Sequence, residues 1–255
     1  GVIGYDLFNE PTALIPPGYF ERGLVWPLYA RLMADIDQVD SHHLFFIEGP
    51  YIADFAPSIR PLSAASRVVY SPHLYTGSQV APLFPQDPAA TPRRIFQQMG
   101  DASQVPAPAW WGELGIVMDK PYATAWAEAA LDTFDDLQVG WAWWQWRQDW
   151  NWGVRDGDGD VVNQVFLGHL ARPFVVATPR GVQARRGASG RGSLTLTVQT
   201  THQDAPVVVS WPTLLPEPTV VGDCVERWTR AAQAARIELW LVPAQGCTVQ
   251  VESIP

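Results

Sequence analysis

The sequence predicts an α/β fold with a parallel sheet, followed by an antiparallel β-sandwich. Up to about residue 171, short apolar runs alternate with helical patterns, and strands that are apolar on both faces and separated by helices are typical of a parallel sheet. From about residue 172, apolar and polar residues alternate without long intervening helices, which is typical of a β-sandwich of about 80 residues. The predicted domains are therefore residues 1–171 and 172–255.

Five apolar runs in the first domain are predicted strands. They are Val2–Phe8, Leu44–Glu48, Val68–His73, Ala109–Leu114 and Val139–Trp146. Each of these runs is short, and each ends in polar or aromatic residues.

Two helices are predicted between these strands. The first begins at Pro27, since proline is favoured at the first helical position. Its apolar residues recur at helical spacing, at Leu28, Leu32, Ile36 and Val39. The second helix is capped by Asp119 and begins at Pro121. Its apolar face carries Trp126, Ala130, Phe134 and Leu137.

The second domain shows the two-residue period of half-buried strands. The apolar residues alternate with polar ones at Leu194, Leu196 and Val198, and again at Ile237, Leu239 and Leu241. Both cysteines of the chain, Cys224 and Cys247, fall in this domain. Either they pair in an exported protein or they are two separate buried thiols.

Composition narrows the class of partner. The chain has 255 residues, with 17 basic and 26 acidic side chains and a formal net charge of -9, which argues against nucleic acid or an anionic membrane as partner. No apolar stretch approaches the roughly 20 residues that span a bilayer.

The chain begins inside a predicted strand, so we expect an upstream segment, and a signal peptide is not observable. The 13 tryptophans suit stacking against sugar rings, although most also fit a core role.

Polar side chains follow each predicted strand, and two of them are glutamates that suggest chemistry. In α/β barrels the carboxyl ends of the strands meet at one face, where catalysis occurs. Glu10 and Glu113 end two different strands, and paired carboxylates facing one cleft are the minimum set for cleaving a glycosidic bond. One must be protonated to assist the leaving group, while the other is ionised. Glu48 also ends a strand and either faces this site or has a structural role.

Four motifs in order, "NEP", "SPHLY", "WGELG" and "GWAWWQW", resemble glycoside hydrolase family 5 of the retaining (β/α)8-barrel clan. This resemblance implies that Glu10 ends the fourth barrel strand as the general acid/base, and that Glu113 ends the seventh as the nucleophile. It further implies substrate-binding roles for Asn9, His73, Tyr75 and Trp144. Trp143 and Trp146 are alternative candidates for the substrate-binding tryptophan. The implied mechanism needs no metal or organic cofactor.

The segment "LARPFVVATPRGV", residues 170–182, resembles the junction between barrel and β-sandwich in endoglycoceramidases. The resemblance implies a carbohydrate or glycolipid substrate of the glycosphingolipid type and a secreted protein. It also implies that residues 1–171 are about strands four to eight of the barrel, so that the first three strands and their sugar-binding residues are missing.

Two other functions remain as alternatives. One is an endo-β-1,4-glucanase or a related polysaccharide hydrolase, and the other is an inactive fragment or a carbohydrate- or lipid-binding protein. A calcium loop at residues 156–160 is disfavoured because Val161 and Leu167 occupy the positions that need Gly and Glu. No nucleophile elbow, phosphate loop or dinucleotide fingerprint is found.

Overall fold

The computed structural model describes eleven parts of the chain, and the chain divides into two compact units. The described residues are 1–50, 67–75, 90–102, 107–147, 152–155, 163–187, 190, 192–200, 205–230, 235–242 and 244–253. The first unit comprises Gly1–Phe134 and Val139–Val162, and the second comprises Asp135–Gln138 and Asn163–Pro255. Residues 156–160, considered above as a calcium loop, lie outside the described residues.

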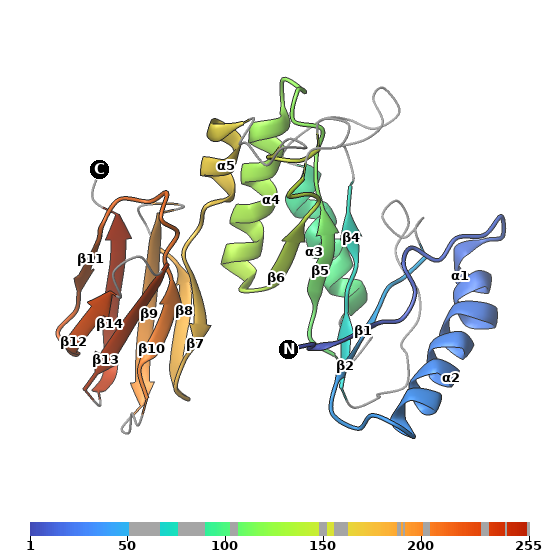
Figure 1. Cartoon of the computed structure of the whole chain (residues 1–255), viewed down its shortest axis with the longest axis horizontal. Coiled ribbons are helices and arrows are strands. Elements are labelled where there is room, and N and C mark those ends of the chain that lie inside the picture. Colours follow the sequence, from blue (N-terminus) through green and yellow to red (C-terminus); the bar gives the residue numbers. More distant parts are fainter. Residues whose placement is uncertain are drawn as a thin grey trace. The chain divides into compact units, whose positions relative to one another are not determined.

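The first unit contains two three-stranded parallel sheets, in the orders β1-β2-β3 and β4-β5-β6 (Figure 1). The strands are β1 (Gly4–Asp6), β2 (Leu44–Ile47), β3 (Val68–Tyr70), β4 (His73–Leu74), β5 (Trp110–Leu114) and β6 (Gly140–Trp143). Each of the five predicted strands is present, and their parallel arrangement is confirmed.

The third predicted strand is split into β3 and β4 by Ser71 and Pro72. Proline has no amide hydrogen to donate to a ladder. The two sheets are nonetheless joined there, because Tyr70 of β3 forms a parallel bridge with Ala109, next to β5, and its N–H donates to the Pro108 carbonyl at 2.9 Å. The strands of the first unit therefore follow one another in chain order, and their carboxyl ends lie along one edge.

The first helical segment begins earlier than predicted. It comprises α1 (Pro17–Phe20), a π-helical turn at Glu21–Val25 and α2 (Trp26–Asp37). The predicted start at Pro27 agrees with α2 to within one residue, and Pro27 lies in the first turn of that helix, but a helical path from Pro17 precedes it without a break. A wide π turn just before the proline is a way to tolerate the amide hydrogen that Pro27 lacks.

The buried face of α2 differs from the predicted one by a partial turn. Trp26, Tyr29 and Met33 are buried, whereas Val39 is 88% exposed and lies beyond the helix. The buried residues pack against Phe45 of β2 and other residues of β2 and β3, with α2 alongside β1 and β2 in Figure 1. This packing positions the segment that leads from β1 into the helix.

Two more helices begin in the first unit. The helix α3 (Ala90–Ala102) was not predicted, and α4 (Ala123–Leu137) begins two residues after Pro121. The predicted cap at Asp119 is wrong because Asp119 lies in a turn that Lys120 N–H closes onto the Val117 carbonyl. Trp126, Ala130 and Phe134 are buried as predicted. Among the described residues, no helix is both long and apolar enough to cross a bilayer.

The second unit contains two four-stranded antiparallel sheets, in the orders β12-β13-β10-β7 and β11-β14-β9-β8 (Figure 1). The elements are α5 (Gln164–Leu170), β7 (Phe174–Ala177), β8 (Val182–Arg186), β9 (Ser193–Thr200), β10 (Val207–Ser210), β11 (Pro218–Val221), β12 (Val225–Arg230), β13 (Arg236–Leu241) and β14 (Ala244–Ser253).

A single apolar core serves both of these sheets. The alternating residues identified from the sequence are all buried in it: Leu194, Leu196, Val198, Ile237, Leu239 and Leu241. Cys224 and Cys247 form a disulfide, which resolves the alternative left open by the sequence.

Candidate active site

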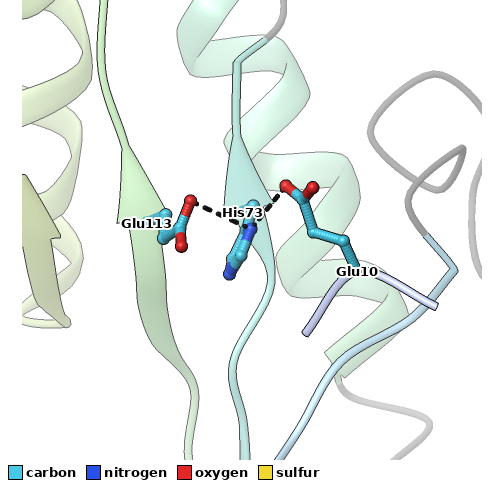
Figure 2. A group of neighbouring side chains, drawn as sticks. All are labelled: Glu10, His73 and Glu113. Carbon is cyan, nitrogen blue, oxygen red and sulfur yellow. Dashed lines mark hydrogen bonds and ion pairs between the residues drawn. The ribbon is translucent and has the colours of Figure 1, made fainter. Parts of the chain in front are cut away.

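Three side chains from separate strand ends converge in the first unit (Figure 2). Glu10 follows β1, His73 begins β4, and Glu113 lies near the end of β5. His73 and Glu113 are partners in the register of the parallel pair β4 and β5, so the strand pairing itself brings them side by side.

His73 lies between the two glutamates. Its Nδ1 lies 2.8 Å from Oε1 of Glu10 and 3.5 Å from Oε2 of Glu113. One oxygen from each carboxylate and one ring nitrogen of His73 all lie within 4.8 Å of one another. The two glutamates predicted to act together are therefore neighbours, with an imidazole bridging them (Figure 2).

Tyr75 contacts the second glutamate. Its hydroxyl donates to Oε2 of Glu113 at 2.7 Å, and its ring packs edge to face against Trp152 with the ring centroids 5.7 Å apart. Since Tyr75 follows His73 by two residues in an extended segment, both side chains project from the same face. Trp152 was not predicted because it lies in a segment without a strand or helix pattern.

A third carboxyl group, that of Glu48, is buried in contact with Glu10 and His73. Its side chain is only 3% exposed, and its Oε2 accepts the Glu10 N–H at 3.1 Å. Glu10 has a φ of +44°, which is uncommon for a residue with a side chain, and its N–H is the one that Glu48 accepts. Burial raises the pKa of Glu48 to about 8, although the charge of nearby His73 opposes the change.

The pKa of His73 is raised above its ordinary value by its acidic neighbours. Burial by itself lowers the pKa of the imidazole, but the hydrogen bond with Glu10 and the charges of Glu48 and Glu113 outweigh that effect. Oε1 of Glu48 lies 3.4 Å from Nε2 of His73, on the opposite edge of the ring from Glu10. His73 is thus surrounded by three carboxyl groups and favours its protonated form.

The backbone of His73 is fixed by a buried glutamine of α3. Gln98 donates from Nε2 to the His73 carbonyl at 2.9 Å, and its Oε1 accepts the indole N–H of Trp111 at 2.9 Å. Gly112 allows β4 and β5 to approach, because a Cβ at this position would lie 2.5 Å from the Ser71 hydroxyl and 3.4 Å from Nε2 of His73.

Two predicted substrate-binding residues lie apart from this contact network. Asn9 is exposed next to Glu10. Trp144 is 44% exposed, and its backbone N–H donates to the Leu114 carbonyl at 2.7 Å. Trp146 is 60% exposed under the guanidinium of Arg155, while Trp143 packs against Trp126. The choice among these three tryptophans for a sugar subsite stays a prediction.

The ligand atoms of Glu10, His73 and Glu113 lie close enough together to bind a cation, and also close enough to exchange protons. However, Nδ1 of His73 is already engaged with Glu10, and Glu113 already accepts the Tyr75 hydroxyl. The arrangement is better suited to moving protons and attacking an electrophilic carbon than to binding an ion. A cofactor-free site stays a prediction.

Comparison with protein families gives a match over the first part of the chain. The family model described as Cellulase (glycosyl hydrolase family 5) matches residues 1–149, which is more than half of the chain. No curated protein matches the chain in sequence.

Comparison with solved structures finds proteins of similar fold, and their names agree with the family match. Endo-glycoceramidase II from Rhodococcus sp., solved as a lactosyl-enzyme intermediate, has a TM-score of 0.78 at 21% identity, and the alignment covers 100% of this chain and 59% of that one. An endogalactoceramidase has a TM-score of 0.64 at 22% identity, with 99% and 58% covered. Sterylglucosidase 1 from Cryptococcus neoformans has a TM-score of 0.67 at 14% identity, with 89% and 43% covered. The chain thus spans about three fifths of the Rhodococcus enzyme and shares its fold.

Proposed function

The chain belongs to glycosyl hydrolase family 5, and from that premise we propose that it is the part of a retaining β-glycosidase that carries both catalytic glutamates. In this proposal Glu113 is the nucleophile and Glu10 is the general acid/base. The strands β1 to β6 correspond to about strands four to eight of a (β/α)8 barrel within residues 1–171, and residues 172–255 form a β-sandwich domain.

The observation that carries the proposal is the distance between the two carboxylates. An oxygen of Glu10 and an oxygen of Glu113 lie within 4.8 Å. Retaining glycosidases separate their carboxyl groups by about 5 to 5.5 Å, whereas inverting enzymes need about 6.5 to 9.5 Å to admit a water molecule. The short separation supports direct attack by one carboxylate.

The proposed reaction has two displacements. Glu113 attacks the anomeric carbon through a carboxylate oxygen while Glu10 gives its proton to the departing glycosidic oxygen, so that the sugar becomes esterified to Glu113. Glu10, now ionised, takes a proton from water, and the water oxygen attacks the same carbon and releases Glu113. Tyr75 donates to Glu113 and keeps its carboxylate in place for both steps.

We propose a glycosphingolipid as substrate. The support comes from the neighbours: the Rhodococcus endo-glycoceramidase II has been solved as a lactosyl-enzyme intermediate and as a complex with ganglioside GM3. The "RPF" junction at residues 172–174 supports the same subfamily. In the proposal Asn9, His73 and Trp144 contact the sugar. We further propose a secreted protein, and the Cys224–Cys247 disulfide supports an oxidising compartment.

The substrate is tested by assaying the whole protein on lactosylceramide and ganglioside GM3 in parallel with cellulose and mannan, with the Glu113→Ala variant as the blank. Release of an intact oligosaccharide and ceramide is the expected result. Hydrolysis of cellulose or mannan alone would replace the substrate with a polysaccharide and leave the two-glutamate mechanism in place. No hydrolysis of any of the four would favour a binding protein or an inactive fragment.

A further inference from the structure

Glu48 is a buried carboxyl group that the double displacement does not use. It comes directly after β2 and makes two contacts with the site through different oxygens. Its Oε2 accepts the backbone N–H of Glu10 at 3.1 Å, and its Oε1 lies 3.4 Å from Nε2 of His73. A buried carboxyl is unfavourable unless it is neutralised or its charge is compensated, so this one needs a proton or a cationic partner.

The two nitrogens of His73 face different groups. Nδ1 is directed at Glu10 and Glu113, and Nε2 is directed at Glu48. Two arrangements fit these contacts. Either Glu48 is ionised beside an imidazolium, or Glu48 is protonated beside a neutral Nε2. Oε1 of Glu48 is buried and has no hydrogen-bond partner among the described residues, and Nε2 of His73, at 3.4 Å, lies at ion-pair distance from it. In both arrangements the pair holds one proton, and Nδ1 keeps its own proton for the catalytic carboxylates.

We propose that Glu48 is a positioning residue of the active site, which anchors the backbone of Glu10 and shares one proton with His73 so that the Nδ1–H of His73 stays directed at Glu10 and Glu113. The role in catalysis rests on the function proposed above. The sharing of the proton does not, and it can be measured independently of any activity.

The surroundings of Glu48 agree with a shared proton. The titratable groups that face it are His73 from β4, Glu10 after β1, Asp6 from β1 and Tyr29 from α2, whose hydroxyl accepts the Glu48 N–H at 3.3 Å. His73 is the one cation among these four. Burial and the negative charges of Asp6 and Glu10 raise the pKa of Glu48, while its neighbours raise the pKa of His73. Each partner therefore holds its proton more tightly than it would in water.

The proposal is tested by NMR titration of the His73 ring in the whole protein, with the signal assigned by its loss in His73→Asn. Glu48→Gln keeps the size and one acceptor for Glu10 N–H but removes the charge. The midpoint of His73 should fall by about one pH unit or more, as expected when an opposite charge is lost at this range. Glu226→Gln removes an exposed carboxyl of the second unit and should leave the midpoint unchanged.

A midpoint that is the same in Glu48→Gln and the parent protein would overturn the proposal, even if the variant melts at a lower temperature. A purely structural role would produce that combination. If Glu48→Gln does not fold, the parent protein still decides the matter. Its His73 signal should follow a two-step curve because the partner titrates as well, and a single step at about 6.5 or below would contradict the shared proton.

Catalysis provides the second readout. If the glycosidase proposal holds, Glu48→Gln should lower kcat more than it changes KM. The alkaline limb of the pH profile of kcat/KM should move to lower pH, in the same direction as the titration midpoint of His73. An unchanged profile would reject the catalytic role of Glu48. If the parent protein hydrolyses nothing, the glycosidase proposal fails while the titration of His73 still decides on the shared proton.

Discussion

The hydroxyl of Tyr75 donates a hydrogen bond of 2.7 Å to Oε2 of Glu113. The ring of Tyr75 is buried, so this contact does not depend on an exposed and mobile side chain. Because His73 contacts the same oxygen at 3.5 Å, two groups two residues apart in the chain hold the proposed nucleophile from one side.

Tyr75→Phe should lower kcat/KM by about 10- to 100-fold, because a hydrogen bond to a charged group contributes about 1.5–3 kcal/mol and 1.4 kcal/mol is a factor of ten. The measurement is steady-state kinetics on a glycosylceramide. Tyr19→Phe, at a residue that is 71% exposed, is the matched control and should leave the rate unchanged. Equal rates for Tyr75→Phe and the parent protein would remove Tyr75 from the site.

Gln98→Ala should destabilise the protein, because it leaves the Trp111 indole N–H and the His73 carbonyl without their buried partner. Each orphaned group costs about 1–3 kcal/mol. Thermal or urea unfolding measures the effect. The neighbouring residue Gln97 is exposed on the same helix and accepts one long hydrogen bond, from Nη1 of Arg94 at 3.5 Å, so Gln97→Ala should cost clearly less stability than Gln98→Ala. Similar losses in the two variants would mean that the Gln98 bridge is not important.

Stability should fall as the pH rises from about 4.5 to 8. The folded pKa of Glu48, about 8, is above its ordinary value of 4.5, so the folded state binds the proton more tightly than the unfolded state does in this range. The raised pKa values of His73 and Asp6 act in the same direction. Asp40, whose pKa is lowered, affects stability only at acidic pH.

Melting temperatures of the parent protein and Glu48→Gln measure this dependence across pH 5 to 8. The slope should be smaller in the variant, which has no carboxyl to titrate at this position. Parallel curves for the two proteins would show that Glu48 does not titrate as its burial requires.

Loss of the Cys224–Cys247 disulfide should lower the stability of the second unit by about 2–4 kcal/mol, since the bond closes a loop between residues 23 apart. Unfolding of the Cys224→Ala/Cys247→Ala variant tests this. A reducing agent should destabilise the parent protein to a similar level and leave the variant unchanged. Two reactive thiols in the native, unreduced parent protein would contradict the pairing.

The proximity of the two glutamates could be anticipated from the sequence because the carboxyl ends of parallel strands meet at one edge. A motif at each strand end was then enough to select Glu10 and Glu113. The alternation in Leu194, Leu196 and Val198 likewise identified a buried strand face, since the side-chain period of a strand is fixed by its geometry.

The remaining features depend on tertiary contacts that a local pattern does not contain. Nothing around Gln98 indicates that its amide bridges α3 to His73 and Trp111, and α3 itself was not predicted. The helical path that leads into Pro27 includes a π turn at Glu21–Val25, which no residue pattern in that segment predicts. The sequence did not decide whether Glu48 faces the site or has a structural role, because the answer depends on its burial and on its contact with His73.

The central claim is that Glu113 attacks the sugar and Glu10 handles the proton. Its most direct test is the product that Glu113→Ala forms from an activated aryl glycoside in the presence of azide. The account predicts a variant without hydrolytic turnover, in which azide occupies the space of the missing carboxylate and gives a glycosyl azide of inverted configuration. Full activity of Glu113→Ala, or a rescued product of retained configuration, would contradict the assignment of Glu113 as the nucleophile.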